Sequence, residues 1–381
     1  MFKKLNLVNN ISVALIFLIS GLYFFKYSGI YLGHPFFLSV LYIMLISGFI
    51  YLSDKLPWNS LKFISEKILI IVLSILVLGA LGWVTFMPRF GNVGRLPAIV
   101  DWIDRFFSNR FPYNSPITPS GFPFLYFLAM PFYFLKNVGY LEIFGLILFS
   151  IAVIRFSHSV KETAIKILML LIVPVVYYEL VVRGELFANA MFALFLLIIT
   201  EKYLDVDKIN LKFFLSAIIF GLVLSTRSVV GLVYVIYILY YFRGEIKSGI
   251  IFSLIAIAVF ILMLVPFVAW DYKSFISNGP FAIQAFLAHL PIWVLLAVFV
   301  FTIYAGLLVS NIHEVFFAAG VVLFLPVFFS MIFAIADVGF YKAVVGDVFD
   351  LSYYVFCVPF LVMAISEYRV DKPLGKILLN N

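Results

Sequence analysis

Apolar runs long enough to cross a bilayer recur along the whole chain, and they constrain its fold more than any other feature. A helix needs about 20 apolar residues to span ~30 Å of hydrocarbon. The sequence therefore predicts an all-α, polytopic transmembrane helical bundle that forms a single domain over residues 1–381. The runs cover residues 11–31, 36–53, 68–88, 121–135, 139–154, 165–182, 186–200, 211–225, 229–242, 248–270, 282–310, 315–336 and 350–366.

The composition excludes a fold in water. Hydrophobic residues make up 65% of the chain and charged residues 12%, whereas a soluble domain is about a quarter charged. A disordered chain, a secreted disulfide scaffold and a nucleic-acid-binding domain are excluded with it. The single cysteine, Cys357, cannot form an internal disulfide. Membrane lipids are therefore expected partners, and nucleic acid is not.

The basic residues predict how the chain is oriented. If the N-terminus is cytoplasmic, most of the 26 Lys and Arg residues fall on the cytoplasmic side, as the positive-inside rule requires. This holds only if residues 121–154 cross once, so we predict a membrane-embedded or re-entrant segment containing Pro123 and Pro131, followed by one span. The result is about 12 spans in the cell (inner) membrane, with both termini cytoplasmic. The cytoplasmic set is Lys3, Lys4, Lys55, Lys62, Lys67, Arg155, Lys161, Lys166, Lys202, Lys208, Lys212, Arg243, Lys247, Arg369, Lys372 and Lys376.

The longest polar segment, residues 89–120, is predicted to be an outer loop that carries an amphipathic helix lying on the outer membrane surface, with its apolar face on lipid. Within it, residues 98–110 place Ile99, Trp102, Ile103, Phe106 and Phe107 on one helical face. Asp101, Asp104 and Arg105 share the other side, because positions three and four apart are helical neighbours. Taken alone, Asp101 and Arg105 could be a simple surface ion pair.

Other outward segments also carry charge at the ends of spans, where charges are costly and are often functional. Carboxylates can act as bases or bind hydroxyl groups, and Arg and Lys can hold a phosphate. For Arg227 we leave two interpretations open, a phosphate ligand or a side chain that snorkels to lipid headgroups. These candidate residues are Glu179, Arg183, Glu185, Asn189, Arg227, Asp271, Tyr272 and Lys273, with Lys342, Asp347 and Asp350 in the last outer loop.

The sequence contains no recognisable motif for a metal site, a nucleotide-binding loop or a nucleophilic serine. The four histidines lack metal-ligand spacing, and the sequence has no Walker loop, dinucleotide fingerprint or nucleophile elbow. No cofactor and no metal-binding residue is indicated, and a requirement for a divalent metal is left open.

An ordered series of motifs resembles the GT-C superfamily of glycosyltransferases, polytopic enzymes that use polyprenyl-phosphate sugars, such as mannosyl- and arabinosyltransferases. The resemblance covers most of the chain from about residue 80 onward. It rests on the Asp-bearing loop, Phe111-Pro112-Tyr113, the Pro-rich stretch 119–125, Val182-Arg183-Gly184-Glu185-Leu186 with Asn189, residues 221–227, and Pro266-Phe267 leading to Trp270-Asp271-Tyr272-Lys273.

The resemblance implies roles for these residues. Asp101 would be the catalytic base, with Asp104 as the second choice, and Arg183, Arg227 and Lys273 would bind the lipid phosphate. The family's acidic loop usually follows the first span, so residues 1–60 would be an N-terminal addition of two helices. The remaining substrate-binding candidates are Arg105, Tyr113, Glu179, Glu185, Asn189, Asp271 and Tyr272.

The expected activity is an inverting glycosyl transfer on the extracytoplasmic face, with residues 89–120 as the catalytic outer loop. The donor would be a polyprenyl-phosphate monosaccharide, and the acceptor a hydroxyl of a glycan, lipid or protein. Two alternatives stay open. An O-antigen polymerase or ligase would use a pyrophosphate donor, and a lipid or glycan transporter would favour repeated halves and broken helices.

Overall fold

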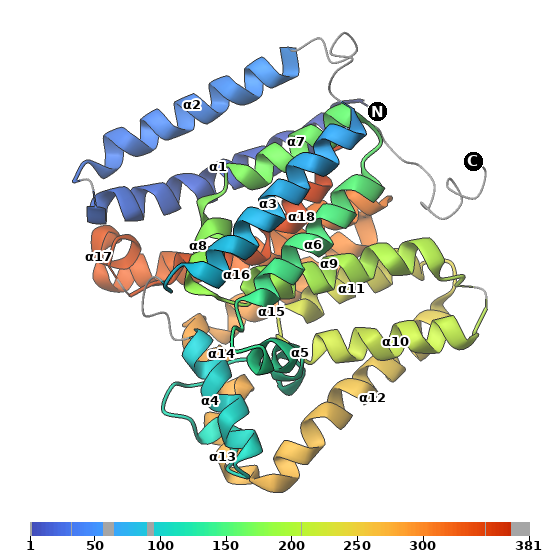
Figure 1. Ribbon diagram of the computed structural model, residues 1–381. Coiled ribbons are helices and arrows are strands. Elements are labelled where there is room, and N and C mark those ends of the chain that lie inside the picture. Colours follow the sequence, from blue (N-terminus) through green and yellow to red (C-terminus); the bar gives the residue numbers. More distant parts are fainter. Residues whose placement is uncertain are drawn as a thin grey trace.

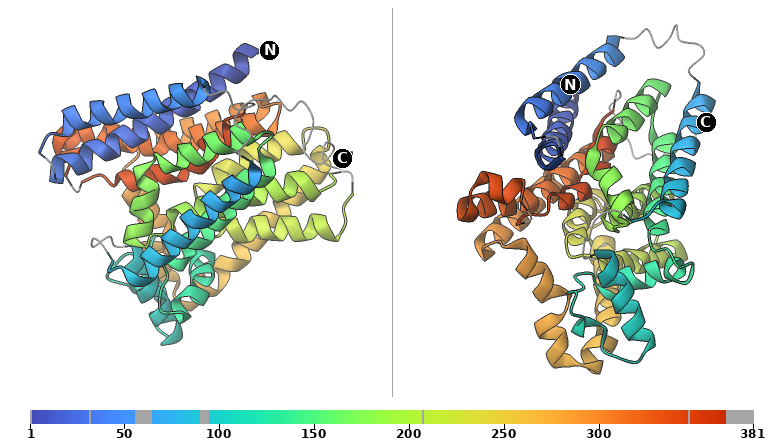
Figure 2. Two further views of the ribbon diagram at one scale, coloured as in Figure 1. Left: turned by 45° about the horizontal axis from the view of Figure 1, so that its top comes forward. Right: turned by 60° about the vertical axis from the view of Figure 1, so that its left-hand side comes forward.

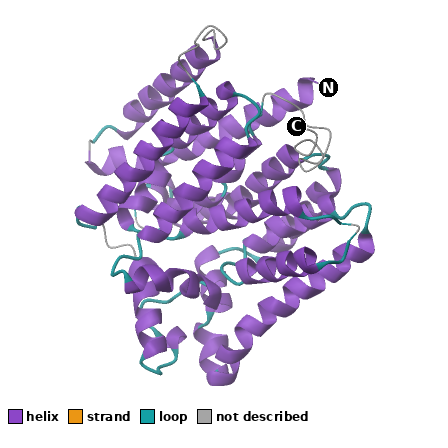
Figure 3. Cartoon of the chain, turned by 45° about the vertical axis from the view of Figure 1, so that its right-hand side comes forward, coloured by secondary structure: helices purple, strands orange, loops and turns teal. Residues whose placement is uncertain are grey.

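The computed structural model describes residues 2–31, 33–55, 65–89, 95–206, 208–346 and 348–366, and these residues form helices without any strand (Figure 3). Lys62, residues 90–94 of the predicted outer loop, Asp347, Arg369, Lys372 and Lys376 lie outside the described residues, as do the side chains of Lys3, Lys4 and Lys55. The predicted all-α class is confirmed.

The helices follow the apolar runs closely, since in an apolar environment a helix satisfies its own backbone hydrogen bonds. The first half contains α1 (Phe2–Tyr31), α2 (Pro35–Lys55), α3 (Glu66–Phe86), α4 (Arg95–Phe107), the 3-10 turn η1 (Pro112–Asn114), α5 (Pro123–Phe134), α6 (Tyr140–Phe156), α7 (Val160–Leu171), α8 (Pro174–Val182) and α9 (Leu186–Tyr203). The second half contains α10 (Leu211–Leu224), α11 (Val230–Tyr241), α12 (Ile246–Trp270), α13 (Tyr272–Asn278), α14 (Pro280–Ala288), α15 (Ile292–Leu308), α16 (Ile312–Val338), α17 (Phe340–Val344), η2 (Leu351–Phe356) and α18 (Val358–Ala364).

Several of these helices have the length and hydropathy of membrane spans. In the described ranges, five helices qualify, and seven spans result if each of two bent helix pairs counts as one. The chain is thus a helical membrane protein. The predicted total of about 12 spans remains a prediction, because shorter apolar helices such as α5, α10 and α11 would have to be included.

Two predicted continuous spans are in fact broken. Residues 165–182 bend by 59° between α7 and α8, and residues 282–310 bend by 93° between α14 and α15. Pro174 stands at the first position of α8, and Pro291 immediately precedes α15. Proline cannot continue a preceding helix without losing a backbone hydrogen bond, so each apolar run divides at its proline.

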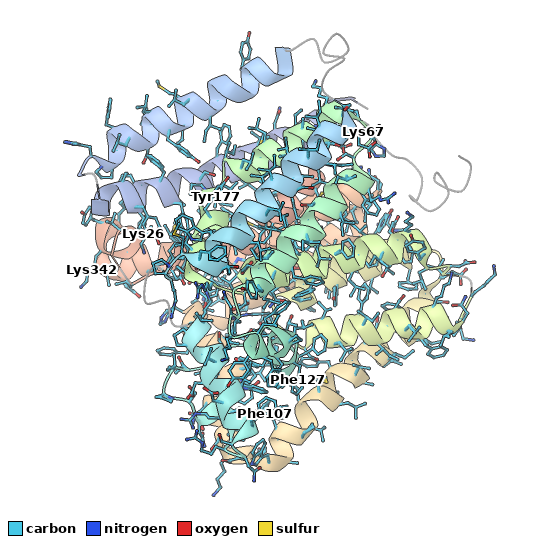
Figure 4. All side chains as sticks on the ribbon, viewed as in Figure 1. Lys26, Lys67, Phe107, Phe127, Tyr177 and Lys342 are labelled. Atoms are coloured by element: carbon cyan, nitrogen blue, oxygen red, sulfur yellow. The ribbon has the colours of Figure 1, made fainter. Side chains whose placement is uncertain are left out.

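The long helices have two common ends (Figure 1). We call the end that carries α4, the start of α9 and the turn between α10 and α11 the site end. The opposite end carries the starts of α7 and α16. Lys67 lies toward the opposite end, whereas Lys26 and Lys342 lie toward the site end (Figure 4). The cytoplasmic and outer sides assigned to these ends remain a prediction.

The first helix is an integral part of the bundle. α1 and α2 lie side by side along one flank (Figure 2). At the opposite end, Asn9 Nδ2 donates to the carbonyl of Ser366 at 2.8 Å, and at the site end Lys26 Nζ donates to the carbonyl of Gly346 at 3.0 Å. Both ends of α1 are therefore tied to the last part of the chain.

Candidate functional site

The start of α9 gathers carboxylates from three elements. The Ala188 amide donates to Glu142 Oε2 at 3.0 Å, and the Leu186 amide donates to Glu179 Oε2 at 3.4 Å. Glu185 stands at the N-cap but does not cap the helix with its own side chain. The first turn of a helix has unpaired amides and a partial positive charge, so it stabilises carboxylates that α6 and α8 supply.

A glycine makes this arrangement fit. α8 ends at Val182 and is capped by Arg183, whose φ of 55° is left-handed, and Gly184 follows before α9 begins. A Cβ atom at Gly184 would lie 2.0 Å from Glu179 Oε2. The glycine therefore lets the chain turn directly past the buried Glu179 carboxylate.

Arg95 pairs with two carboxylates at the start of α4. Its guanidinium donates to Glu179 Oε1 at 2.6 Å and to Asp350 Oδ2 at 2.9 Å, and it lies 5.7 Å from the centre of the Tyr353 ring. Glu179 is fully buried, and Arg95 is 9% exposed. This side chain joins α4 to α8 and to η2.

Arg227 forms a second ion pair in the turn between α10 and α11. It is 4% exposed, donates to Glu185 Oε1, and also donates to Ser120 Oγ at 3.0 Å. The neighbouring Thr226 hydroxyl donates to Asn189 Oδ1 at 2.7 Å. Burial alone would lower the pKa of Arg227, but the Glu185 carboxylate outweighs this effect and raises it, so the guanidinium stays charged.

These contacts form one network, which we call the polar cluster. Glu142, Glu179 and Glu185 lie close enough to interact electrostatically, and Tyr353 is near both arginines. The polar cluster consists of Arg95, Ser120, Glu142, Glu179, Glu185, Asn189, Thr226, Arg227 and Asp350.

Several buried atoms of the polar cluster have no hydrogen-bond partner among the described residues. Two are acceptors, Glu142 Oε1 and Glu185 Oε2, and three are donors, Asn189 Nδ2, Arg95 Nε and Arg227 Nε. Unpaired buried polar groups cost about 1–3 kcal/mol each. A ligand whose groups both donate and accept, such as a sugar with several hydroxyls, can satisfy both kinds.

The α4 helix confirms the predicted ion pair but places it away from the polar cluster. Arg105 Nε donates to Asp101 Oδ2 at 2.7 Å, and Tyr133 donates its hydroxyl to Asp104. Asp101 follows Arg95 by six residues, which is about 9 Å along the helix axis and on a different face. Asp101 and Arg95 therefore face different surroundings.

The Asp101 carboxyl group is negatively charged at neutral pH. Desolvation alone would raise the pKa of Asp101, but hydrogen bonds from Ser115 and Arg105 and the positive charges of Arg105 and Arg110 hold it below its ordinary value. The group is ionised at neutral pH and partly exposed, so it can accept a proton from a molecule that reaches the surface of α4.

The predicted amphipathic helix is present, but its apolar face packs on protein. Trp102 is fully buried and stacks on Tyr126 of α5 with ring centres 4.2 Å apart. Trp102 also contacts Phe267 of α12, and Figure 4 shows Phe107 and Phe127 in this same region. The expectation that this face rests on lipid is thus wrong for Ile99, Trp102 and Ile103, which are buried.

The fold brings six of the predicted residues to the polar cluster or beside it: Tyr113, Glu179, Glu185, Asn189, Arg227 and Asp350. Tyr113 is buried and donates its hydroxyl to the carbonyl of Gly121, next to Ser120. Arg227 lies inside the protein, so the interpretation in which it snorkels to headgroups is wrong.

The remaining predicted residues have other contacts. Arg183 donates to the carbonyls of Val84 and Met87 and so caps the end of α3. Asp271 caps α13 by accepting from the amide and hydroxyl of Ser274 at 3.0 Å and 2.6 Å. Tyr272 is 64% exposed, and Lys273 is exposed on the same short helix.

Four members of the polar cluster were not among the candidate site residues: Arg95, Ser120, Glu142 and Thr226. Arg95 and Glu142 are the two charged residues among them. Glu142 is an acidic residue in an apolar run, and such a residue inside a span is a functional signal by itself. The partner of Arg95 is 84 residues away in sequence, so no local pattern identifies this pair.

Within the described ranges, no three His, Cys, Asp or Glu side chains lie close enough together to hold a metal ion. Comparison with known proteins finds no match: no family model, no curated protein and no solved structure resembles the chain significantly.

Proposed function

We propose that the protein is a membrane glycosyltransferase. It moves a monosaccharide from a polyprenyl-phosphate donor to a hydroxyl of a glycan, lipid or protein on the extracytoplasmic face. The observation that carries this proposal is the polar cluster, which buries unpaired donors and acceptors at one end of an apolar bundle. A donor with a polar head and a long apolar tail matches that combination.

The sugar is held by the polar cluster in this proposal. Glu185 Oε2 accepts from sugar hydroxyls, and Asn189 Nδ2 donates to them, because both atoms are buried without a partner in the described chain. Both residues lie on the same side of α9, four positions apart. Carboxylate and amide groups are suitable for recognising hydroxyls, which both donate and accept.

Asp101 acts as the base, which requires the anomeric carbon of the bound sugar to point out of the polar cluster toward α4, so that the acceptor hydroxyl lies within hydrogen-bonding reach of Asp101. It takes the proton of the acceptor hydroxyl while the acceptor oxygen bonds to the anomeric carbon and the bond from that carbon to the lipid phosphate breaks. This direct displacement inverts the configuration at the carbon. Asp101 is better suited than Glu185, since it is accessible and ionised, whereas Glu185 is 1% exposed and paired with Arg227.

The leaving phosphate requires a positive charge that no buried carboxylate already neutralises. Arg95 and Arg227 are paired inside the polar cluster, and Arg183 is engaged by the end of α3. Lys273, exposed on α13, is therefore the strongest of the three predicted phosphate ligands. A cationic group at the departing oxygen stabilises the charge that develops in the transition state.

Transfer by purified protein from a panel of radiolabelled polyprenyl-phosphate sugars tests the proposal. We expect Asp101→Asn to lower turnover by about 10²–10⁴-fold, the usual contribution of a general base, without changing the melting temperature by more than a degree or two. Asp104→Asn is the matched control one helical turn away and should cost much less. Full activity of Asp101→Asn would remove this residue from the reaction.

A transporter of lipids or glycans is the second candidate, because the bend between α7 and α8 is a broken helix of the kind found in transporters. The two functions separate in detergent. A glycosyltransferase turns over in micelles, whereas a transporter shows activity only across a closed membrane. Donor turnover in micelles would exclude the transporter.

A further inference from the structure

Glu201 is a buried acidic residue outside the polar cluster that has no basic partner among the described residues. Glu201 lies at the far end of α9 from Glu185 and is 2% exposed. Tyr240 donates its hydroxyl to Glu201 Oε1 at 3.3 Å. Glu201 Oε2 has no hydrogen-bond partner in the part of the chain that the structure describes, and no described Lys, Arg or His forms an ion pair with it.

Other oxygens near Glu201 are also unpaired. Thr200 Oγ1 and the Tyr237 hydroxyl are both buried without a partner among the described residues. The Tyr237 hydroxyl approaches the Glu201 carboxyl group closely enough to interact with it, but not in the geometry of a good hydrogen bond. Glu201 of α9 and Tyr237 of α11 thus bring a carboxyl group and a hydroxyl together in one buried region.

The helix itself makes a negative charge unfavourable at this position. The carboxyl end of a helix carries a partial negative charge from its unpaired carbonyls, and Glu201 adds a carboxylate in the last turn of α9. A buried carboxylate without a counter-ion costs several kcal/mol. At the start of α9, by contrast, Glu185 is paired with Arg227, and the partial positive charge of the helix start favours its carboxylate.

We propose that Glu201 and Tyr237 form a binding site for a monovalent inorganic cation, Na⁺ or K⁺. Hard cations prefer oxygen ligands, and the end of a helix attracts positive charge. A single positive charge balances the single carboxylate, whereas a divalent ion would leave one charge uncompensated in a buried site. The cation fixes the end of α9 against α11.

The test is thermal unfolding of the full-length protein in detergent at constant ionic strength, with N-methylglucamine chloride replaced stepwise by NaCl or KCl. The wild type should show a saturable rise in melting temperature of about 2 °C when the preferred cation reaches roughly ten times its Kd. The comparison of the two salts shows which ion the site prefers.

Glu201→Gln should lose this rise and melt at or above the wild-type temperature without the cation, because it removes the uncompensated charge. Tyr237→Phe should shift the midpoint of the titration to a higher cation concentration. The control is Asp205→Asn, whose carboxylate is exposed and paired with Lys208 at 3.0 Å, and which should keep the full rise. No rise with either salt in the wild type, or an equal rise in Glu201→Gln, would overturn the proposal. Absence of the rise in the wild type would mean that the Glu201 carboxyl group is protonated and needs no cation.

Discussion

Replacing Arg227 by methionine should destabilise the protein strongly. Methionine fills a similar volume but leaves the Glu185 carboxylate buried without its counter-ion, and it removes the hydrogen bond to Ser120. Breaking a buried pair by removing one partner costs about 3–5 kcal/mol. An unfolding entropy of about 2.1 cal/mol/K per residue converts this cost, for 381 residues, into a fall in melting temperature of roughly 4–6 °C.

The structure also predicts how the loss is repaired. Adding Glu185→Gln to Arg227→Met removes the unpaired charge, so the double variant should melt above the single one. Arg227→Lys keeps the charge, but a lysine cannot reach both Glu185 and Ser120 as the guanidinium fork does. The loss of one charge-assisted hydrogen bond, about 1.5–3 kcal/mol, should lower the melting temperature by roughly 2–4 °C.

Thermal unfolding of each purified variant measures these effects, with Arg155→Met as the control. Arg155 is exposed near the end of α6 and should change the melting temperature little. The reasoning is refuted if Arg227→Met melts like the wild type, or if the double variant is less stable than Arg227→Met alone.

Three further outcomes follow from the geometry. Gly184→Ala should lower the melting temperature by several degrees, because its Cβ would meet Glu179 Oε2; Gly244→Ala, where no atom lies within 4 Å, should not. Ionised Asp101 stabilises the fold above its unfolded pKa of about 4. That stability is lost as the pH falls through the lowered folded pKa, so the wild type should approach Asp101→Asn in stability below about pH 4. A cysteine at Asn109, on a background without Cys357, should react with an impermeant reagent in intact cells; reaction only after permeabilisation would contradict the predicted orientation.

The helices were largely predictable because each apolar run has to satisfy its own backbone hydrogen bonds in lipid. The breaks inside residues 165–182 and 282–310 were not recognised, although Pro174 and Pro291 mark both of them. Composition showed that the segments are apolar, and only the proline positions indicate where they divide. The surface helix predicted over residues 98–110 is shifted by three residues, since α4 begins at Arg95 and ends at Phe107.

The polar cluster was only partly predictable. Glu185, Asn189 and Arg227 could be selected because each is a polar residue at the end of an apolar run. Their pairing could not be predicted, since Arg227 is 42 residues from Glu185 and 107 residues from Ser120. Which side chain neutralises which is decided by the packing of α9 against α10 and α11, and local sequence carries no information on that packing.

A matched pair of buried carboxylates at two helix starts tests the central claim, that the polar cluster is the sugar site of a glycosyltransferase. Glu185 begins α9 at the site end, and Glu314 lies in the first turn of α16 at the opposite end, where it accepts from Ser310. Replacing either glutamate by glutamine removes the negative charge and keeps nearly the same side-chain shape. In transfer from polyprenyl-phosphate sugars, Glu185→Gln should reduce turnover by at least tenfold, because a buried hydrogen bond of a charged group contributes about 1.5–3 kcal/mol. Glu314→Gln should transfer at nearly the wild-type rate. Equal turnover of the two variants, or no transfer by the wild type from any donor of the panel, would contradict the account.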